Sequence, residues 1–315
     1  MDFAKNVFIS ICIPAYKRVE YLERLLASIS IQEYRDFEVV VSDDSPDNSV
    51  QELCAEFSTQ FPIKLLKNEK ALGTPENWNH AIRHASGEWI KLMHDDDWFS
   101  TPTSLREFAN AAQGNPGAII FSSYKNIFLD ENREEEVVPP TNRLRWVQLE
   151  PATLFSSNCI GPPSVIMHPA SLAIEYDRTI KWVVDIDFYV RALEGRKLKH
   201  IESSLINVGM SQEQVTVSCV HNPNVEIPEN FYMLSKIGFK KMENWLVYDA
   251  FWRLIRNLNI RSLREIELTG YTQRIPASIE KMILWQNKIP RRLLRIGLLS
   301  KVFMFLNFLM YRKHQ

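Results

Sequence analysis

The segment WIKLMHDDD, residues 89–97, leads from a short apolar run directly into three consecutive aspartates. The apolar run predicts a buried β-strand over residues 89–93. A strand that ends in Asp95, Asp96 and Asp97 is electrostatically costly, because like charges a few ångströms apart repel strongly at reduced dielectric. Mg²⁺ or Mn²⁺ would offset that repulsion, since both take carboxylate ligands and complete their shells with substrate phosphates. The segment therefore predicts a metal site. The alternative is a solvated acidic turn that caps a helix after Trp98.

Further short apolar runs lie on either side of this segment, at residues 8–13, 37–42, 63–67 and 118–121. Between them, residues 21–31 and 75–84 have the apolar spacing of helices, the second with Pro75 in its first turn. Strands that alternate with helices in this way are typical of an α/β fold with a mostly parallel central sheet.

Ligands of such sheets bind at the carboxyl ends of the strands, and in this chain those ends are polar. The first strand leads into Pro14, Ala15 and Tyr16, and the second into Asp43 and Asp44. The ring of a tyrosine can stack on a base, and a carboxylate can hold the base or the ribose. Together with the acidic run, these residues predict a nucleotide pocket, although Asp43-Asp44-Ser45 alone would also fit a simple turn.

The composition narrows the class of protein. With 315 residues and 45% hydrophobic content, the chain can bury a substantial core, and its formal net charge of -1 gives no basic field for nucleic acid. Four cysteines without zinc-ligand spacing disfavour a structural zinc site and a disulfide framework, and the N-terminus does not have the pattern of a secretory signal. A cytoplasmic protein is expected.

Taken in order, these motifs resemble family 2 glycosyltransferases of the GT-A fold. The resemblance is carried by residues 11–16, 38–45 and 87–98, and by three single residues between them, Asn68, Gly73 and Asn79. It implies an inverting transfer of a sugar from a nucleoside diphosphate sugar, usually of UDP or dTDP type, to an acceptor hydroxyl. Synthesis of a cell-surface polysaccharide is the expected context, with a glycan or lipid-linked glycan as acceptor.

The resemblance also implies roles for single residues. Tyr16 and Asp44 match the positions that contact the base, and the other nucleotide contacts are expected from Pro14, Ala15, Asp43 and Asn79. Asp96 matches the main ligand of Mn²⁺ or Mg²⁺, with Asp97 beside it and Asp95 facing the ribose or the metal. His94 stands where the family often has aspartate, so the register of the metal-binding motif within residues 94–97 stays open.

A weaker part of the resemblance reaches the chemistry. Residues 158–164 resemble the acceptor-side loop of the family, and residues 182–191 resemble its ED-containing helix start, which makes Asp185 the general base. Val184 stands where glutamate is common, and Ser211 where relatives often carry histidine; His221 is a possible but unsupported substitute. The alternative for Asp185 is the N-cap of a helix over residues 186–193.

The predicted organisation is a glycosyltransferase domain over residues 1–225, with nucleotide-sugar binding in 1–123 and the acceptor side in 124–225, and a helical region over 226–315. Residues 125–150 read as an exposed connection, and 164–167 and 198–208 as added strands around a helix at 187–193.

The last 35 residues, from Lys281 to Gln315, contain no acidic residue, and Lys288, Arg291, Arg292 and Arg295 fall on one face of a helix. This basic face lies next to an apolar run, which predicts peripheral binding to the anionic inner face of the cell membrane. The alternative is that the helix packs on the protein's own core or on a partner subunit.

Two rival functions remain. A sugar nucleotidyltransferase would share the sheet, but residues 14–18 contain no glycine for a phosphate-binding loop. A non-catalytic member that binds the nucleotide sugar or acts as a scaffold is the second. A dehydrogenase is disfavoured because no GxGxxG occurs.

Overall fold

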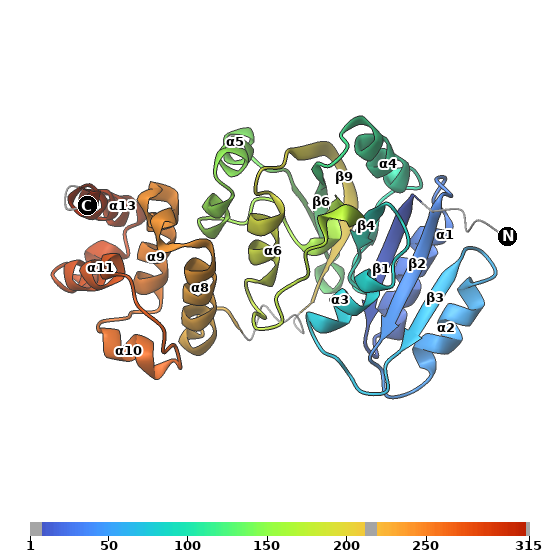
Figure 1. Ribbon diagram of the computed structural model, residues 1–315, viewed down its shortest axis with the longest axis horizontal. Helices are drawn as coiled ribbons and strands as arrows, with labels where there is room; N and C mark the ends of the chain where they lie inside the picture. The colour runs from blue at the N-terminus through green and yellow to red at the C-terminus, as the bar shows by residue number, and fades with distance from the viewer. Residues whose placement is uncertain (1–7, 212–218, 313–315) are drawn as a thin grey trace. The chain divides into compact units, whose positions relative to one another are not determined.

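The computed structural model describes residues 8–211 and 219–312. The chain divides into two compact units (Figure 1). The first comprises Met1–Gln148 and Cys159–Gln212, and the second Leu149–Asn158 and Glu213–Gln315. The first unit carries the sheet, and the second is helical.

The amino-terminal half of the sheet is parallel and follows the strand order β3-β2-β1-β4. Its strands are β1 (Ile9–Ala15), β2 (Phe37–Asp43), β3 (Ile63–Lys67) and β4 (Trp89–Leu92). Strands β1 and β4 are almost wholly buried, because helices cover both faces of a parallel sheet, and apart from Ser10 and Lys91 their residues are apolar. The predicted α/β fold with a mostly parallel sheet is confirmed.

The helices between these strands pack one apolar side against the sheet. They are α1 (Val19–Ser30), α2 (Ser49–Phe57) and α3 (Glu76–Arg83). In α1 the buried residues include Leu22, Leu25, Leu26 and Ile29, which are the residues whose spacing predicted the helix. Pro75 is the N-cap of α3 and not part of its first turn.

The second half of the sheet mixes directions. Strand β8 (Ile166–Pro169) is antiparallel to both β4 and β6 (Ile119–Phe128), and β6 is parallel to β9 (Leu198–Met210). Strand β5 (Trp98–Phe99) is antiparallel to β9. Helices α4 (Ser104–Gly114) and α6 (Val184–Ala192) belong to the same unit, and the short 3₁₀ helices are η1 (Leu129–Glu131), η3 (Pro163–Val165) and η4 (Ala170–Leu172).

Residues 125–150 are mostly exposed, as predicted, but the prediction that they form an irregular connection was wrong. Strand β6 continues to Phe128, β7 (Arg133–Val137) pairs with it, and α5 (Thr141–Leu149) follows. The sequence of β7 is REEEV, and four of its five residues are exposed. Because an edge strand keeps its charged residues in water, it lacks the alternation of apolar and polar residues that identifies a strand.

The second unit confirms the predicted C-terminal helices. They are α8 (Pro223–Ile237), α9 (Trp245–Asn257), α10 (Leu263–Leu268), α11 (Ala277–Asn287), α12 (Arg291–Leu294) and α13 (Gly297–Arg312), with 3₁₀ helices η2 (Pro151–Phe155) and η5 (Phe239–Glu243). Its core includes Phe231, Phe251, Trp252, Met304 and Phe308. Assignment of separate roles to residues 1–123, 124–225 and 226–315 stays a prediction.

The tail does not form the single helix that the predicted basic face required. Helix α11 ends at Asn287, Pro290 precedes α12, and α13 begins at Gly297. Proline has no N–H and cannot continue a helix, so Arg291 and Arg292 lie in α12, whereas Lys288 and Arg295 lie in the connections before and after it. None of the helices within residues 8–211 and 219–312 has the length and apolar content that a membrane span requires.

Candidate functional site

The ends of β1, β2 and β4 lie at one edge of the sheet, because β1 is parallel to both of its neighbours. Two contacts connect these ends directly. The backbone N–H of Asp44 donates to the carbonyl oxygen of Ala15 at 3.0 Å. The guanidinium of Arg18 pairs with Asp95 at 2.8 Å and with Asp96 at 3.2 Å. The structure therefore brings together the three polar strand ends that sequence reasoning had selected.

The residues best arranged to bind a metal are His94, Asp96 and Asp97, whose potential ligand atoms lie within 4.8 Å of one another. The buried Nε2 of His94 has no hydrogen-bond partner in the described part of the chain. Burial lowers the pKa of His94 to about 4, so the imidazole is neutral and can act as a ligand. Two carboxylates and a neutral imidazole form a donor set that suits Mn²⁺. Sequence reasoning had treated His94 only as a source of register ambiguity.

The alternative reading of the acidic run, a cap on a helix after Trp98, was wrong. Trp98 and Phe99 form β5, and α4 begins only at Ser104.

Burial makes this acidic run costly, as its sequence predicted. Burial and the charge of Asp96 raise the pKa of Asp97 well above its ordinary value. Burial also raises the pKa of Asp95 to about 7, although Arg18 opposes that shift. Lys91, in β4, is fully buried, its charge acts on Asp97, and burial lowers its pKa to about 7. The raised pKa values make Asp95 and Asp97 easier to protonate than ordinary aspartates. An additional cation would stabilise the ionised form of these carboxylates.

Two arginines complete the site, and sequence reasoning missed both. Arg18 lies in the turn after β1 and pairs with the acidic run. Arg24, on α1, donates from Nη2 to the carbonyl oxygen of Asp96 at 3.1 Å and lies over the Trp98 ring at 3.9 Å. Because Arg18 already contacts the Asp96 carboxylate, a bound metal ion has to share that group with it or displace it.

Of the residues expected to contact the nucleotide, some are exposed and others already have hydrogen-bond partners within the protein. The Tyr16 side chain is 49% exposed and therefore accessible to a flat ring. The carboxylate of Asp44 accepts hydrogen bonds from Asn68 Nδ2 at 2.8 Å and from the backbone N–H groups of Leu72 and Gly73 at 3.0 and 2.8 Å. Asp44 thus shapes the loop before α3 and leaves acceptor capacity on its oxygens.

Asp43 and Asn79 have clear structural partners. Asp43 is fully buried, pairs with Lys67 at 2.8 Å and accepts from the backbone N–H of Ser45. The amide of Asn79 exchanges two hydrogen bonds with the backbone of Tyr176, at 2.8 and 2.9 Å. Nucleotide contact by these two residues, and by Pro14 and Ala15, stays a prediction.

Asp185 is the second residue of α6 and is not the N-cap, which is Val183. Its carboxylate accepts from the backbone N–H of Ile186 at 2.8 Å, and the residue is partly buried. Burial raises the pKa of Tyr124, and the charges of Asp97 and Asp185 raise it further. Tyr124 therefore lies within electrostatic range of both the acidic run and Asp185.

The predicted acceptor-side loop is connected to the same site. The backbone N–H of His94 donates to Ser164 Oγ at 2.9 Å, and Lys91 Nζ donates to the Ser164 carbonyl oxygen. At the other end of the loop, Tyr189 donates its hydroxyl hydrogen to the Gly161 carbonyl oxygen at 3.0 Å.

Ser211, the position where histidine was expected, lines a small recess of about 40 Å³. The other lining residues are Tyr21, Arg24, Asp96, Leu129, Asp130, Gly209 and Met210. The buried Ser211 Oγ has no hydrogen-bond partner in the described part of the chain. Residues 212–216, which complete that predicted motif, lie outside the described residues. His221 belongs to the second unit and donates its backbone N–H to Glu226.

Gly209 allows the close approach of β9 to the acidic run, which leads to a prediction. A Cβ at Gly209 would lie 2.4 Å from the carbonyl oxygen of Asp96, and that oxygen belongs to the backbone and cannot rotate away. Gly209→Ala should therefore displace Asp96, weaken Mn²⁺ binding and lower stability by about 1–3 kcal/mol. Isothermal titration with Mn²⁺ and thermal melting measure both effects. Gly114→Ala is the control, because a Cβ there meets no atom within 4 Å. Normal Mn²⁺ binding by the Gly209 variant would contradict the prediction.

The fold and the acidic site define the class of a GT-A-like protein, and comparison with known proteins agrees. The family model described as Glycosyl transferase family 2 matches residues 10–166, about half of the chain and the part that carries the three strand ends. The chain belongs to glycosyltransferase family 2. An uncharacterized glycosyltransferase of Haemophilus influenzae is 32% identical over 108 residues, which is 34% of this chain and 35% of that protein. The matched segments span less than two thirds of the first two curated relatives.

Solved structures show the same fold over nearly the whole chain. S. aureus TarS 1-349 in complex with UDP-GlcNAc has a TM-score of 0.68 at 16% identity, and the match covers 98% of this chain and 92% of that one. The mannosyltransferase PcManGT from Pyrobaculum calidifontis, in complex with GDP-Man and Mn²⁺, has a TM-score of 0.53 at 15% identity, covering 96% and 86%. At these identities the likeness concerns the fold alone.

Proposed function

We propose that this protein is a metal-dependent, inverting glycosyltransferase that moves a sugar from a UDP or dTDP sugar to an acceptor hydroxyl. The observation that carries the proposal is the grouping of His94, Asp96 and Asp97 at the end of β4, beside the polar ends of β1 and β2. Family 2 membership and the nucleotide-sugar complexes of the two structural relatives support a nucleotide-sugar donor.

The donor nucleotide would bind at the ends of β1 and β2. The exposed ring of Tyr16 can stack on the base, and the Asp44 carboxylate can accept a hydrogen bond from it. Asp95, which accepts from the Tyr16 backbone N–H, would face the ribose. Arg18 presents its guanidinium beside these groups, at the place where a diphosphate would pass toward the acidic run.

His94, Asp96 and Asp97 fit Mn²⁺ or Mg²⁺ by their donor chemistry and by the unpartnered Nε2 of His94. Such a cation, when bound, would neutralise the charge that develops on the leaving diphosphate. The protein itself supplies Arg18 and Arg24 as fixed positive charges at the same place.

Asp185 would act on the acceptor. Its carboxylate takes the proton from the acceptor hydroxyl as the hydroxyl oxygen attacks the anomeric carbon from the face opposite the nucleotide. The bond between that carbon and the diphosphate oxygen breaks, and the nucleoside diphosphate leaves. The position of Asp185 on α6 supports this role. The charges of both Asp185 and Asp97 raise the pKa of Tyr124, so Asp185 lies in the same region as the acidic run. A covalent intermediate is not required.

The acceptor class is a glycan or a lipid-linked glycan, and the context is cell-surface polysaccharide synthesis. The rival functions differ in testable ways. A nucleotidyltransferase would form the nucleotide sugar from a nucleoside triphosphate and a sugar phosphate, and a non-catalytic member would bind the donor without turning it over.

A donor screen tests the proposal. UDP, dTDP and GDP sugars are added to the protein with and without Mn²⁺, and the melting temperature is followed. A ligand that binds only the folded state at a hundredfold excess over its Kd stabilises by about 2.7 kcal/mol. We expect this shift for a UDP or dTDP sugar and only when Mn²⁺ is present, together with slow release of the nucleoside diphosphate. A shift without any release or transfer would favour the non-catalytic reading, and metal-independent transfer would remove the cation from the proposal.

A further inference from the structure

The two sides of helix α13 are chemically different. Its buried residues are Ser300, Met304, Asn307 and Phe308, and they pack on α9. Tyr248 of α9 donates its hydroxyl hydrogen to Asn307 Oδ1 at 2.6 Å, and Trp252 donates from Nε1 to Ser300 Oγ at 3.0 Å. These buried hydrogen bonds fix the rotation of α13 about its own axis. One of the alternatives for the tail, packing on the protein's own core, therefore holds for this side of the helix.

The opposite side of α13 is apolar and exposed. Between 38% and 76% of each residue is accessible, and the residues recur at intervals of four, three, one, three and one, as on one face of a helix. They form the α13 stripe: Leu298, Val302, Phe305, Leu306, Leu309 and Met310. Contiguous apolar surfaces of this kind mark interaction sites, whereas scattered single residues do not.

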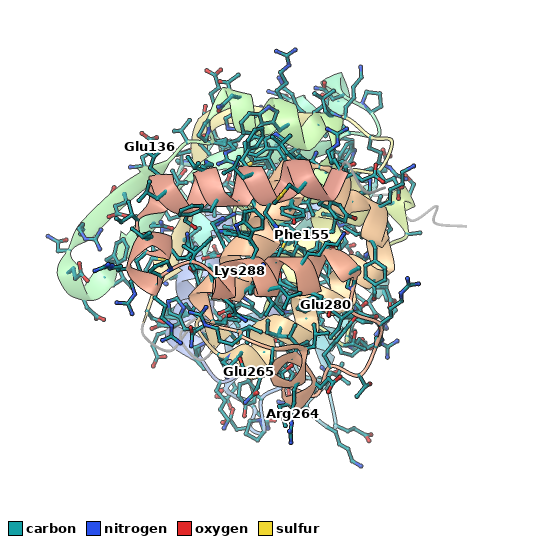
Figure 2. All side chains as sticks on the ribbon, turned by 90° about the vertical axis from the view of Figure 1, so that its left-hand side faces the viewer. Glu136, Phe155, Arg264, Glu265, Glu280 and Lys288 are labelled. Atoms are coloured by element: carbon teal, nitrogen blue, oxygen red, sulfur yellow. The ribbon has the colours of Figure 1, made fainter. Side chains whose placement is uncertain are left out.

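The charged residues of the segment that carries the α13 stripe all have the same sign. No acidic residue occurs from Lys281 to Arg312, and seven exposed basic residues do: Lys281, Lys288, Arg291, Arg292, Arg295, Lys301 and Arg312. Figure 2 looks onto these helices and labels three carboxylates, Glu136 of β7, Glu265 of α10 and Glu280 of α11, none of which belongs to α12 or α13. At 100° per residue, Lys301 and Arg312 fall along one edge of the stripe.

We propose that the α13 stripe and its basic residues dock on an anionic lipid surface, with the helix lying in the plane of the membrane. The leucines and Phe305 would enter the boundary between headgroups and acyl chains, while the arginines and lysines contact lipid phosphates. With 16 residues the helix is too short to cross a bilayer, which takes about 20. This inference goes beyond the proposed function and does not depend on the donor site.

A lipid surface fits the stripe better than a second copy of the chain does. A twofold contact through α13 would bring the same basic residues of both copies together, and like charges across an interface oppose association. An anionic surface instead complements them. A lipid surface can also bury an apolar stripe without a groove of matching shape.

The test uses point variants of the full chain, since removing the tail would also remove Met304 and Phe308 from the core of the second unit. Leu298→Gln with Leu309→Gln changes two exposed leucines of the stripe and leaves the buried side intact. Leu149→Gln with Leu268→Gln is the matched control, because those leucines are 75% and 74% exposed and lie outside α13. A third variant replaces Arg291, Arg295 and Lys301 by glutamine.

Cosedimentation with vesicles of phosphatidylcholine, with and without phosphatidylglycerol, measures the partition constant. We expect the wild type and the control to bind only the anionic vesicles, and less as salt rises. The stripe variant and the charge variant should each bind at least about 10-fold more weakly. Equal binding by the stripe variant, or no binding by the wild type, would overturn the proposal. Analytical ultracentrifugation without lipid tests the alternative partner. Self-association of the wild type that the stripe variant abolishes would also overturn the proposal, because the stripe would then bind a second copy of the chain.

Discussion

Asp96→Asn should abolish sugar transfer and weaken Mn²⁺ binding by at least about 100-fold, while the protein stays folded. Loss of a group that merely orients a metal ligand typically costs 10- to 100-fold in affinity, so loss of a carboxylate ligand itself should cost no less. The fold should tolerate the change. Asp96 raises the pKa of both Asp95 and Asp97, so its removal relieves repulsion, and the lost ion pair with the partly exposed Arg18 contributes little.

Mn²⁺ titration, donor binding and transfer rate, measured on the same preparation, test this expectation. Asp130→Asn is the matched control, since Asp130 is an exposed carboxylate that lines the same recess. It should bind Mn²⁺ as the wild type does. Full transfer activity in saturating chelator, or an active Asp96 variant, would exclude a metal ion held by Asp96 from the reaction.

The parallel part of the sheet and the edge that carries the site could be predicted from sequence, for physical reasons. Strands buried on both faces are largely apolar, as Ile9–Ala15 is apart from Ser10, and that pattern can be recognised locally in the sequence. Once the strands are parallel, their carboxyl ends must share an edge, so Asp44 and Asp96 are brought to one region without any knowledge of packing.

The residues that sequence reasoning missed are those whose roles depend on contacts between distant segments. Arg18 and Arg24 reach residues more than 70 positions away, and Gly209 donates its N–H to Asp97 across 112 positions. Lys91 looked like an ordinary polar residue in a strand, and only the fold makes it a buried charge. The break between the helices of the tail could have been predicted from the sequence, because Pro290 lies within the predicted basic face.

The general base is the prediction on which the enzyme proposal most depends, because donor binding alone would also occur in an inactive relative. Asp185→Asn should leave donor affinity nearly unchanged and lower kcat by about 100-fold or more, the usual scale of general-base catalysis. Asparagine keeps the size of the side chain and an oxygen that can accept from the Ile186 N–H. It cannot take a proton from the acceptor hydroxyl. Donor Kd, melting temperature and kcat of this variant separate binding, folding and chemistry.

Asp187→Asn is the control that the structure offers, two residues further along α6. Asp187 is fully buried and pairs with Arg191 at 2.6 Å, so its replacement leaves that guanidinium without its partner charge and should lower the melting temperature. The kcat of the folded fraction should stay close to that of the wild type. The two variants therefore predict opposite patterns, with chemistry lost at Asp185 and stability lost at Asp187. A near-normal kcat for Asp185→Asn would remove Asp185 from the mechanism, and a large loss of kcat for Asp187→Asn would make Asp187 the candidate base.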